Sequence, residues 1–513
     1  MIARVNSCAV CGIDAMVVEV EVDISFGLPV FNMVGLAETA VRESKERVRT
    51  AIHNSGYTFP MDRVVINLAP ADIKKEGTGL DLPVALGILA ASGLIPKQTP
   101  LPWLILGELS LDGRVKPVKA VLPYALAARE NGFKGVIVPK ENADEAAMVT
   151  DIDVLPVSHL AQAVDFFSGF LQIAPHRVDP GMFARRPDAA NPKDFADVRG
   201  QAHVKRALEI AAAGSHHVLM TGPPGSGKSM LAQRISTILP LPTFGESLEI
   251  ARIYSVMGLV GKNFPVLGGR PFRAPHHTIS DAGMAGGGPR PVPGEISLAH
   301  HGVLFLDELP EFKRNVLEVL RQPMEEGQVT IVRGGVKATY PCRFMLVAAM
   351  NPCPCGNFGN PLQECSCAGP QILRYRSKIS GPLLDRIDIQ IQVPQVSYDE
   401  MAGESPSESS ATIRARVDAA RAIQNQRFKR SGLICNARMG PRLLKRFCIL
   451  ETDAQSVLHQ AMDTLGFSAR TFNSILKVAR TIADLACEKQ IGRQHILEAI
   501  QYKSCGRRDG PAF

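Results

Sequence analysis

The sequence contains few aromatic residues and no long hydrophobic segment. One Trp and seven Tyr occur among 513 residues, so we do not expect an aromatic platform of the carbohydrate-binding kind. The longest uncharged apolar run spans residues 82–95, which is 14 residues with a proline inside, too short to cross a bilayer. No basic stretch followed by an apolar one opens the chain. We therefore predict no signal peptide, a cytoplasmic protein and no membrane partner.

The composition is that of an ordinary globular protein. Hydrophobic residues make up 45% of the chain and charged residues 21%, which excludes a largely disordered protein. Eleven cysteines without an export signal favour reduced thiols or bound metal over disulfides. At about 150 residues per domain, the length predicts about three domains.

The positive charge lies at the C-terminal end. The net charge is +7, from 57 Lys and Arg against 50 Asp and Glu. Residues 401–513 carry 18 Lys and Arg against 10 Asp and Glu, which is +8, while the first 400 residues carry 39 against 40. A basic C-terminal region favours a polyanion such as nucleic acid as partner. The alternative is surface charge that only keeps the protein soluble.

Changes in composition divide the chain into three expected domains and two linkers. The first linker carries four prolines, and the second is a short polar stretch with one proline, as is typical of connecting segments. The predicted division is an α/β domain at 1–173, a linker at 174–193, an α/β domain at 194–402, a linker at 403–411 and a helical domain at 412–513.

Hydrophobic periodicity predicts the elements of both α/β domains. Alternation predicts strands, and apolar spacing of three to four residues predicts helices. In the first domain we expect strands at 17–24, 62–68 and 103–106, and helices at 39–54 and 81–92. In the second we expect buried parallel strands at 217–221, 302–306 and 343–349, and a β-hairpin at 329–340 around Gly334 and Gly335.

Residues 222–229 match the phosphate-binding pattern G-x-x-x-x-G-K-[ST] between an expected strand and an expected helix. In this pattern the glycines turn backbone N–H groups toward phosphate oxygens, Lys228 reaches the β- and γ-phosphates, and the Ser229 hydroxyl binds Mg²⁺. A chance match in a chain of this length arises about 2% of the time from residue frequencies, so a plain glycine-rich turn is disfavoured. The predicted nucleotide-binding residues are Gly222, Pro223, Pro224, Gly225, Ser226, Gly227, Lys228 and Ser229.

The strand expected at 302–306 ends in two acidic residues, Asp307 and Glu308. We expect Asp307 to hold Mg²⁺ together with Ser229, and Glu308 to polarise the attacking water. Many strands end in acids, so this pattern gains its weight from the phosphate-binding motif. Together the two motifs predict an enzyme that hydrolyses ATP with Mg²⁺.

The order of the motifs resembles that of AAA+ ATPases of the magnesium-chelatase and MCM-helicase branch. The phosphate-binding motif is followed by Asp307 and Glu308, by the expected hairpin and then by Ala-Ala-Met-Asn-Pro at 348–352. Residues 379–388 resemble the arginine-finger segment of that branch, and residues 467–470 resemble its second sensor. Nearly the whole chain resembles the bacterial YifB/ComM family of magnesium-chelatase-like proteins. This implies an AAA+ α/β core followed by a helical lid domain.

The resemblance implies roles for three more residues. Asn351 would be the polar sensor near the attacking water, Arg386 would reach the γ-phosphate of a neighbouring subunit, and Arg470 would contact the bound nucleotide from the lid. An arginine supplied by a neighbour requires a ring, and the resemblance implies a homo-hexamer. The alternatives are an intrachain ion pair of Arg386 with Asp385 or Asp388, a surface position for Arg470, and Arg374 or Arg376 as the finger.

The expected hairpin carries Arg333 and Lys337 beside its turn, and it resembles the pre-sensor hairpin of this branch. In a ring it would face the pore, where the two cations would contact DNA phosphates without reading sequence; a solvated hairpin tip is the alternative. A long insert at 254–299 contains Arg273, His276 and His277. For these three residues we weigh a pore or allosteric role against local packing.

The family resemblance implies a DNA translocase or helicase that promotes branch migration in homologous recombination and natural transformation. Its partner would be single-stranded, duplex or branched DNA. One alternative is a protein-remodelling ATPase subunit of the magnesium-chelatase type. Another is an assembly protein that binds ATP as a structural ligand, but Glu308, Asn351 and Arg386 serve hydrolysis rather than binding and argue against it.

The N-terminal domain resembles the α+β proteolytic domain of Lon protease. The stretches at 77–83 and 113–122 fall where Lon carries its nucleophilic Ser and its Lys, and they place Asp81 and Leu122 at those positions. A carboxylate cannot replace the Ser nucleophile, and Leu cannot act as its base. We therefore expect a non-proteolytic domain that serves ring assembly or DNA contact.

Four cysteines lie within 15 residues in the pattern C-x-C, nine residues, C-x-C. Cys353, Cys355, Cys365 and Cys367 can converge on a tetrahedral Zn²⁺, and such a metal would brace the subunit interface near Arg386. Redox pairs or free thiols are the alternatives. The isolated C-x-x-C at 8–11 is expected to pack in the core.

Overall fold

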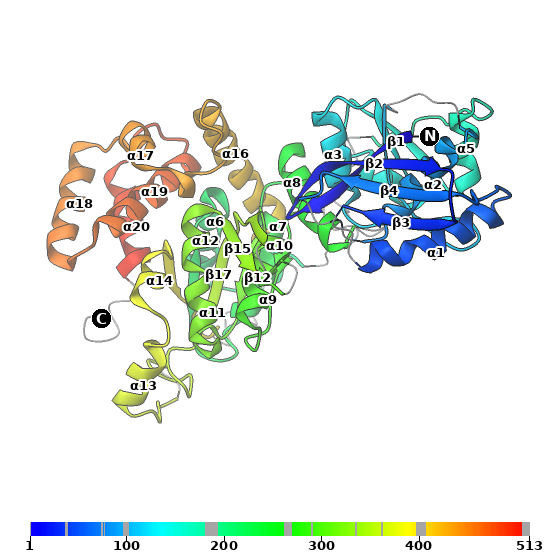
Figure 1. The fold of residues 1–513 in the computed structure, drawn as a ribbon. Helices are drawn as coiled ribbons and strands as arrows, with labels where there is room; N and C mark the ends of the chain where they lie inside the picture. The colour runs from blue at the N-terminus through cyan, green and yellow to red at the C-terminus, as the bar shows by residue number, and fades with distance from the viewer. Residues whose placement is uncertain are drawn as a thin grey trace.

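The computed structural model describes most of the chain and arranges it as an elongated molecule (Figure 1). An α/β region lies at one end, a second α/β region lies in the middle and a helical region lies at the other end. The described residues are 2–35, 39–72, 75, 77–95, 102–179, 193–260, 269–288, 291–333, 336–360, 363–396 and 407–504. No helix among them is long and apolar enough to cross a membrane.

The N-terminal region is built on a mixed sheet of seven strands in the order β3-β4-β2-β1-β5-β8-β9. A long antiparallel pair, β1 (Ile2–Cys11) and β2 (Asp14–Ser25), forms its centre. The other strands are β3 (Val30–Val34), β4 (Arg63–Ala69), β5 (Trp103–Ile105), β8 (Gly135–Pro139) and β9 (Asp153–Val157), with β6 (Glu108–Leu109) and β7 (Val115–Lys116) forming a separate pair.

Helices cover this sheet, and they explain the longest apolar run of the sequence. Every residue of α2 (Asp81–Ala91) is buried between α1 (Thr39–Asn54) and the pair β1–β2. A helix that is apolar all round belongs in a core, so the part of the run from 82 to 91 is a core helix, and the run leaves the core at residues 92–94. The other helices are α3 (Val121–Glu130), α4 (Ala143–Ala146) and α5 (Leu160–Phe167).

The central region contains a sheet of five parallel strands in the order β11-β14-β17-β10-β18. Most of their residues are fully buried, as expected for a parallel sheet covered on both faces. The strands are β10 (Val218–Thr221), β11 (Phe272–Arg273), β14 (Val303–Leu306), β17 (Met345–Met350) and β18 (Ile389–Gln392). The three predicted strands and the mixed α/β fold class are confirmed, and β11 shows that the segment 254–299 contributes to the sheet rather than forming only an insert.

Short helices and a hairpin surround this sheet. The predicted hairpin is confirmed as β15 (Gln328–Arg333) and β16 (Val336–Pro341), although its turn at Gly334 and Gly335 lies outside the described residues. The helices are α6 (Ala202–Gly214), α7 (Lys228–Ile238), α8 (Phe244–Met257), α9 (Asp281–Ala285), α10 (Glu295–Leu298), α11 (Arg314–Val319), α12 (Arg321–Glu326), α13 (Gly369–Arg376) and α14 (Gly381–Asp385), and β12 (Gly286–Gly287) pairs with β13 (Val292–Pro293).

The C-terminal region is helical, and its first helix begins at Ser410, inside the segment predicted as a linker. Its apolar side chains join those of α6 and the parallel sheet in one hydrophobic cluster, so this region packs directly on the central one. The helices are α16 (Ser410–Phe428), α17 (Pro441–Phe447), α18 (Thr452–Leu465), α19 (Ala469–Leu485) and α20 (Arg493–Ser504).

The N-terminal and central regions share a hydrophobic cluster in which α3 packs against α8. The Ser255 hydroxyl on α8 donates to the Glu145 carboxylate at 2.5 Å, and the Leu122 N–H donates to the same carboxylate at 3.1 Å. The predicted linker at 174–193 runs without helix or strand along 174–179, where His176 N donates to Val154 O at 2.8 Å; residues 180–192 lie outside the described part.

Candidate nucleotide-hydrolysis site

The phosphate-binding motif forms the loop that joins β10 to α7. Gly225 and Gly227 adopt φ of +76° and +86°, which L-residues with side chains avoid. At Gly222, a Cβ would collide with the carbonyl of Val393, so the loop passes directly beside the end of β18. Glycine is therefore required at these positions by backbone geometry, and the loop can present its N–H groups at the start of α7.

Lys228 is nearly buried at the first position of α7. Its Nζ donates to the carbonyls of Gly222 at 2.7 Å and Pro223 at 2.8 Å, and lies 3.3 Å from Oδ1 of Asn351. Burial lowers the pKa of the ammonium, and the carboxylates of Asp307 and Glu308 oppose that shift. Phosphate oxygens can replace these carbonyl acceptors, because both accept from the same ammonium hydrogens.

Ser229 and Asp307, the two residues predicted to hold Mg²⁺, are in hydrogen-bond contact. The Ser229 hydroxyl donates to Oδ2 of Asp307 at 2.5 Å, and the backbone N–H of Glu308 donates to Oδ1 at 3.0 Å. A hydroxyl and a carboxylate side by side are the oxygen ligands that Mg²⁺ uses. Glu308 itself has φ of +51° and an exposed side chain, which places its carboxylate in solvent beside the loop.

The topology of the sheet explains why these residues meet. The strands β14, β17 and β10 are neighbours and parallel, so their carboxyl ends share one edge. Asp307 follows β14, Asn351 follows β17 and the phosphate-binding loop follows β10. Ligands bind at this edge in open α/β sheets. The structure thus brings together all the nucleotide-site residues predicted from 222–229, with Asp307, Glu308 and Asn351.

Arg386 and Arg470 converge on one carboxylate that the sequence reasoning missed. Arg386 Nη2 lies 2.9 Å from Oε2 of Glu325 at the end of α12, and Arg470 Nη2 bonds Oε1 of the same residue. Because 145 residues separate Arg470 from Glu325, no local sequence pattern marks this pair. The arrangement places the two arginines at one location, so Arg470 is engaged beside Arg386 rather than with the phosphate-binding loop of its own chain.

The structure also describes the surroundings of the alternative partner Asp388 and of the rival arginines Arg374 and Arg376. Asp388 pairs with His216 at 3.2 Å and accepts from the Ser474 hydroxyl at 2.6 Å, which ties the sheet to α19. Burial raises the pKa of Asp388, but the bond from His216 outweighs it and holds the pKa well below its usual range. Arg386 therefore pairs with Glu325 and not with Asp388 among the described contacts. Of its rivals on α13, Arg374 is exposed and Arg376 donates to Pro352 O at 3.1 Å.

Comparisons with known proteins agree with this architecture. Three family models match in succession: subunit ChlI of Mg-chelatase over residues 20–142, magnesium chelatase subunit ChlI over 194–401, and its C-terminal part over 407–503. YifB of Escherichia coli is 44% identical over 507 residues, covering 98% of this chain and 97% of that protein. Competence protein ComM of Haemophilus influenzae is 43% identical over 511 residues, covering 99% and 98%.

The chain belongs to the magnesium-chelatase-like YifB/ComM family. Lon protease 2 of Bacillus subtilis is 28% identical over 179 residues, which is 31% of this chain and 32% of that protein. The family assignment made from the order of motifs is confirmed.

In this family member, the two Lon-like positions are separate structural residues. Asp81 is buried, and its carboxylate pairs with Arg47 at 3.0 Å and accepts from Leu109 N at 3.3 Å. Burial raises the pKa of Asp81 to about 6, although Arg47 opposes the shift. Leu122 is fully buried in the contact with α8. Among the described residues, no hydrogen bond or ion pair joins Asp81 to Leu122, and the two do not form a nucleophile–base pair.

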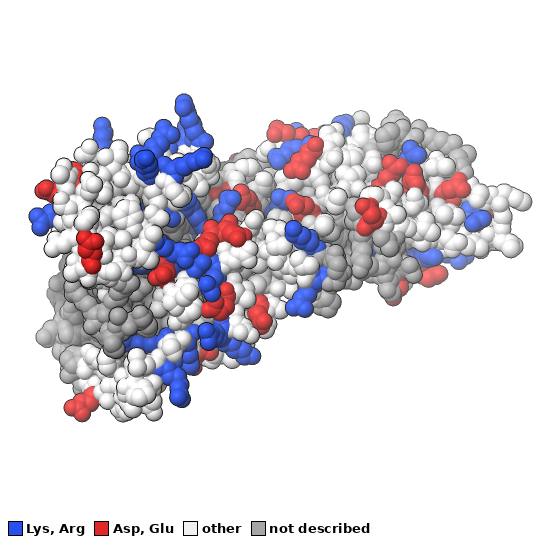
Figure 2. Space-filling view, turned by 60° about the vertical axis from the view of Figure 1, so that its left-hand side comes forward, with Lys and Arg blue, Asp and Glu red and all other residues white. Residues whose placement is uncertain are grey.

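The hairpin β15–β16 presents its cations to solvent while its base is packed. Arg333 and Lys337 are exposed, and they lie beside each other at the tip because Val332 pairs with Lys337 and Arg333 with Val336. Tyr340 is buried and donates to Pro291 O at 2.6 Å, which anchors the base. Figure 2 shows groups of Lys and Arg at the upper left, at the height of the C-terminal helices, and at the lower left, at the height of α13, with mixed charges over the N-terminal region.

The histidines and Arg273 of the segment 254–299 divide between packing and the site. Arg273 forms a bidentate pair with Glu295, with both contacts at 2.7 Å, so its role is local. His276 lies with its ring 4.1 Å from that of His277, and His277 Nδ1 is 3.6 Å from Oε2 of Glu308. His277 therefore borders the proposed catalytic carboxylate, which its position in the sequence did not reveal.

A second carboxylate–histidine cluster lies between α8 and the start of β14. Glu249 Oε2 is 2.9 Å from Nε2 of both His300 and His301. His300 Nδ1 accepts the N–H of Arg343 at 2.9 Å, so the ring proton of the neutral imidazole lies on Nε2 and points at the carboxylate. Burial lowers the pKa of His300 to about 4, despite the hydrogen bond to Glu249. Glu249, His300 and His301 form a hydrogen-bonded cluster. Because Nε2 of His300 carries the ring proton, it is not available to a metal.

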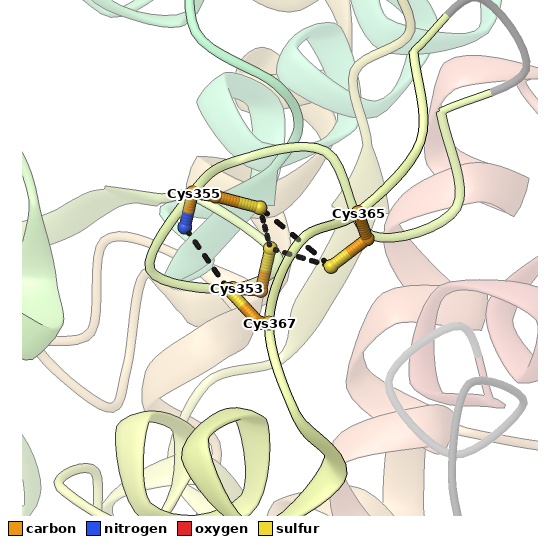
Figure 3. A group of neighbouring side chains, drawn as sticks. All are labelled: Cys353, Cys355, Cys365 and Cys367. Atoms are coloured by element: carbon orange, nitrogen blue, oxygen red, sulfur yellow. Dashed lines mark hydrogen bonds between the residues drawn. The ribbon is translucent and has the colours of Figure 1, made fainter.

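The four predicted cysteines come together in the loop that follows Asn351 (Figure 3). Cys353 Sγ lies 3.4 Å from Cys355 Sγ and 3.7 Å from Cys365 Sγ, and the Cys355–Cys365 distance is 3.6 Å. Cys367 Sγ accepts the N–H of Cys355 at 3.4 Å. A backbone N–H of Asn357 lowers the pKa of the Cys355 thiol to about 5. The set is partly exposed and holds four sulfur atoms within 4.8 Å of one another.

The two cysteines of the isolated C-x-x-C motif at 8–11 differ in burial. Cys8 is buried, and burial raises the pKa of its thiol. Cys11 is exposed at the end of β1. The expectation of core packing is therefore correct for Cys8 and wrong for Cys11, because Cys11 lies at the turn of the β1–β2 hairpin, where the strand leaves the core.

Proposed function

We propose that the protein is a ring-forming ATPase that uses ATP hydrolysis to move along DNA. The observation that carries the proposal is the meeting of Lys228, the Ser229–Asp307 pair, Glu308 and Asn351 at one sheet edge, because this set serves phosphate binding and hydrolysis together. The proposed units are an N-terminal domain at 1–173, an ATPase core at 194–402 and a helical lid at 412–513.

In the proposed reaction, the phosphate-binding loop and Lys228 hold the β- and γ-phosphates of ATP. Ser229 and Asp307 would hold Mg²⁺, which supplies charge neutralisation at the transferring phosphoryl group. Glu308 accepts a proton from the attacking water or orients it, since its carboxylate is exposed beside the loop. Asn351 lies 3.3 Å from Lys228 and can hold the same water or the γ-phosphate.

We propose that Arg386 and Arg470 act on the nucleotide of a neighbouring subunit in a hexamer. Both side chains bond Glu325, away from the loop of their own chain. The arginine pair would exchange Glu325 for a phosphate of the neighbour, and such arginines contribute about 10³–10⁵ to the rate of phosphoryl transfer. Glu325 would then hold both cations in place until that contact forms.

The proposed DNA contacts are electrostatic. The exposed Arg333 and Lys337 at the hairpin tip can contact phosphates in a central pore, and the C-terminal region adds a charge of +8. The name of the Haemophilus relative, competence protein ComM, supports a role in handling incoming DNA. We propose branch migration during homologous recombination and natural transformation as that role.

We propose that Cys353, Cys355, Cys365 and Cys367 bind one Zn²⁺ ion. A tetrahedral ion with Zn–S bonds of about 2.3 Å separates its sulfur atoms by about 3.8 Å. The described sulfur distances of 3.4, 3.6 and 3.7 Å are close to that separation.

The test is steady-state ATP hydrolysis without DNA and with single strands, duplex and a forked junction, each at two salt concentrations. We expect strong stimulation by DNA that weakens as salt rises, because phosphate contacts release counterions. Lys228→Ala provides the blank. Hydrolysis that is indifferent to every DNA would contradict the DNA motor and favour a protein-remodelling ATPase of the magnesium-chelatase type.

A further inference from the structure

The cysteine loop lies in contact with the phosphate-binding loop. Gly356 N donates to Cys353 O at 3.0 Å and closes a turn in which Gly356 has φ of +85°. A Cβ on Gly356 would collide with Cδ of Pro224 and lie 2.7 Å from its Cγ. The third position of the phosphate-binding motif therefore rests on the backbone of the cysteine loop, with no room between them for a methyl group.

The same loop is also attached to the second side of the nucleotide site. It begins immediately after Asn351, whose Oδ1 is 3.3 Å from Lys228 Nζ. Arg376 holds the loop from α13, since it donates to Pro352 O at 3.1 Å and lies 5.0 Å from the Phe358 ring. The position of residues 352–358 thus bears on both Pro224 and Asn351.

Sulfur geometry indicates what holds this loop in shape. Phe358 N donates to Cys353 Sγ at 3.3 Å and Cys355 N donates to Cys367 Sγ at 3.4 Å, so backbone N–H groups already point at the sulfur atoms, as they do around metal thiolates. Close thiolates repel one another unless a cation lies between them. The separations fit a single tetrahedral ion, and a cluster of several iron ions would spread its cysteines further apart.

We propose that one zinc ion bound by the four cysteines is the support that positions the phosphate-binding loop, through the contact of Gly356 with Pro224 and through Asn351. This inference rests on the proposed ATPase function. The zinc touches no substrate; it fixes residues 352–358, and these fix the two sides of the nucleotide site. Zinc content consequently sets the affinity for ATP, although the four cysteines lie outside the phosphate-binding motif.

Two glycines of the loop provide a matched pair of variants. Gly356 and Gly359 both have left-handed φ, of +85° and +78°, so alanine carries a similar backbone strain at either position. Only Gly356 faces Pro224, because a Cβ on Gly359 meets no atom within 4 Å. In the full-length protein we expect Gly356→Ala to raise the Kd for the fluorescent analogue mant-ATP about tenfold or more, and Gly359→Ala to change it by less than about twofold.

Zinc content and thermal melting are measured on the same samples. We expect about one zinc per chain in the wild type and in both variants, and the same melting temperature for the two variants, so the loss of affinity in Gly356→Ala reports positioning rather than unfolding. Equal mant-ATP affinity of the two variants would overturn the role of the contact.

Removal of the metal forms the second arm. A mercurial reagent releases zinc, and a chromogenic chelator measures the amount released. We expect the release to raise the Kd for mant-ATP about tenfold. Thiol and Zn²⁺ reverse the treatment, and we expect the Kd to return to its original value. If the zinc-free wild-type protein binds mant-ATP normally and added Zn²⁺ does not change its affinity, the inference is overturned and the proposed ATPase is left intact. A zinc-loaded wild type that does not bind mant-ATP would overturn the proposed function as well.

Discussion

Two glycine-containing loops of this chain lead into helices, and the charged residues that open these helices have opposite environments. Before α2, Gly77 has φ of +83° and Asp81 opens the helix; before α7, Gly227 has φ of +86° and Lys228 opens the helix. The Asp81 carboxylate is satisfied inside the protein by Arg47 and by Leu109 N. Lys228 instead rests on backbone carbonyls that a ligand can replace.

The difference between the loops lies in what their neighbours present. Around Asp81 the chain supplies an arginine, so the charge is paired inside the protein and needs no partner from outside. Beside Lys228, two adjacent parallel strands end in Asp307 and Asn351, which offer oxygens and an amide to a ligand at the open edge of the sheet. A polar residue at the start of a helix becomes a functional site only where tertiary structure leaves its partners to be supplied from outside.

The largest expected effect is the loss of ATP turnover in Lys228→Ala. The variant removes the cation that we propose contacts the β- and γ-phosphates, so we expect binding of mant-ATP to fall below detection and hydrolysis to stop. Asp81→Ala is the matched change in the other loop, and we expect it to leave ATP affinity and turnover within about twofold. Wild-type affinity in Lys228→Ala, or a strong loss in Asp81→Ala, would break the comparison.

The next effect concerns the arginines held by Glu325. We expect Arg386→Ala to lower kcat for ATP by about 10³–10⁵ while mant-ATP affinity stays near the wild-type value, because in our proposal the arginine acts on the transferring phosphoryl group. Arg470→Ala should lower kcat in the same way if the two side chains act at one place. Arg374→Ala, on the exposed face of α13, is the control; a normal kcat in Arg386→Ala would move the finger to Arg374 or Arg376.

The two regions should respond to pH in opposite directions. In the central sheet, burial lowers the pKa of His217 and of His300 to about 4, below the unfolded value of about 6.5. Their contribution to stability is therefore present above pH 6.5 and is lost as pH falls toward 4, by about 3 kcal/mol for each histidine. Asp81, whose pKa burial raises to about 6, gives stability that is present below about pH 4 and is lost as pH rises through 6.

Hydrogen exchange followed by mass spectrometry measures this contrast peptide by peptide. After correction for intrinsic exchange rates, we expect peptides of β10 and β14 to lose protection from pH 7.5 to 5 and peptides of α2 to gain it. His217→Asn should reduce the loss in the central sheet, and Asp81→Asn should remove the gain in α2. A common direction in both regions would contradict the opposite signs.

The smallest expected effect lies at the hairpin. Replacing Arg333 and Lys337 together by Ala should weaken DNA binding about tenfold and reduce the slope of log affinity against log salt by about 2, without changing mant-ATP affinity. Binding to duplex oligonucleotides across a salt series measures both quantities. Lys313→Ala, which changes an exposed lysine just before α11, is the control, and an unchanged salt slope in the double variant would place the DNA contact elsewhere.

Local pattern was sufficient for several elements of the two α/β regions. The helix expected at 39–54 agrees with α1, and the strand expected at 302–306 agrees with β14 to within one residue. Strand β11 escaped prediction because two residues give no periodicity to read. The linker predicted at 403–411 overlaps the first two residues of α16, because its serines both resemble a loop and cap a helix: the Ser409 hydroxyl accepts the Thr412 N–H at 3.2 Å.

The sequence by itself determined the nucleotide motif, the acids Asp307 and Glu308 after the strand predicted at 302–306 and the four clustered cysteines. It also determined that the two Lon-like positions lack a Ser nucleophile and its Lys. Each of these features consists of particular residue types at short spacing. Backbone geometry and ligand chemistry allow only a few residue types at such positions, so the sequence is enough to identify them. Tertiary structure alone decided that Arg386 and Arg470 share Glu325, that His277 borders Glu308 and that Gly356 lies against Pro224. These contacts join residues 31 to 145 positions apart, and only the packing of separate elements sets such distances.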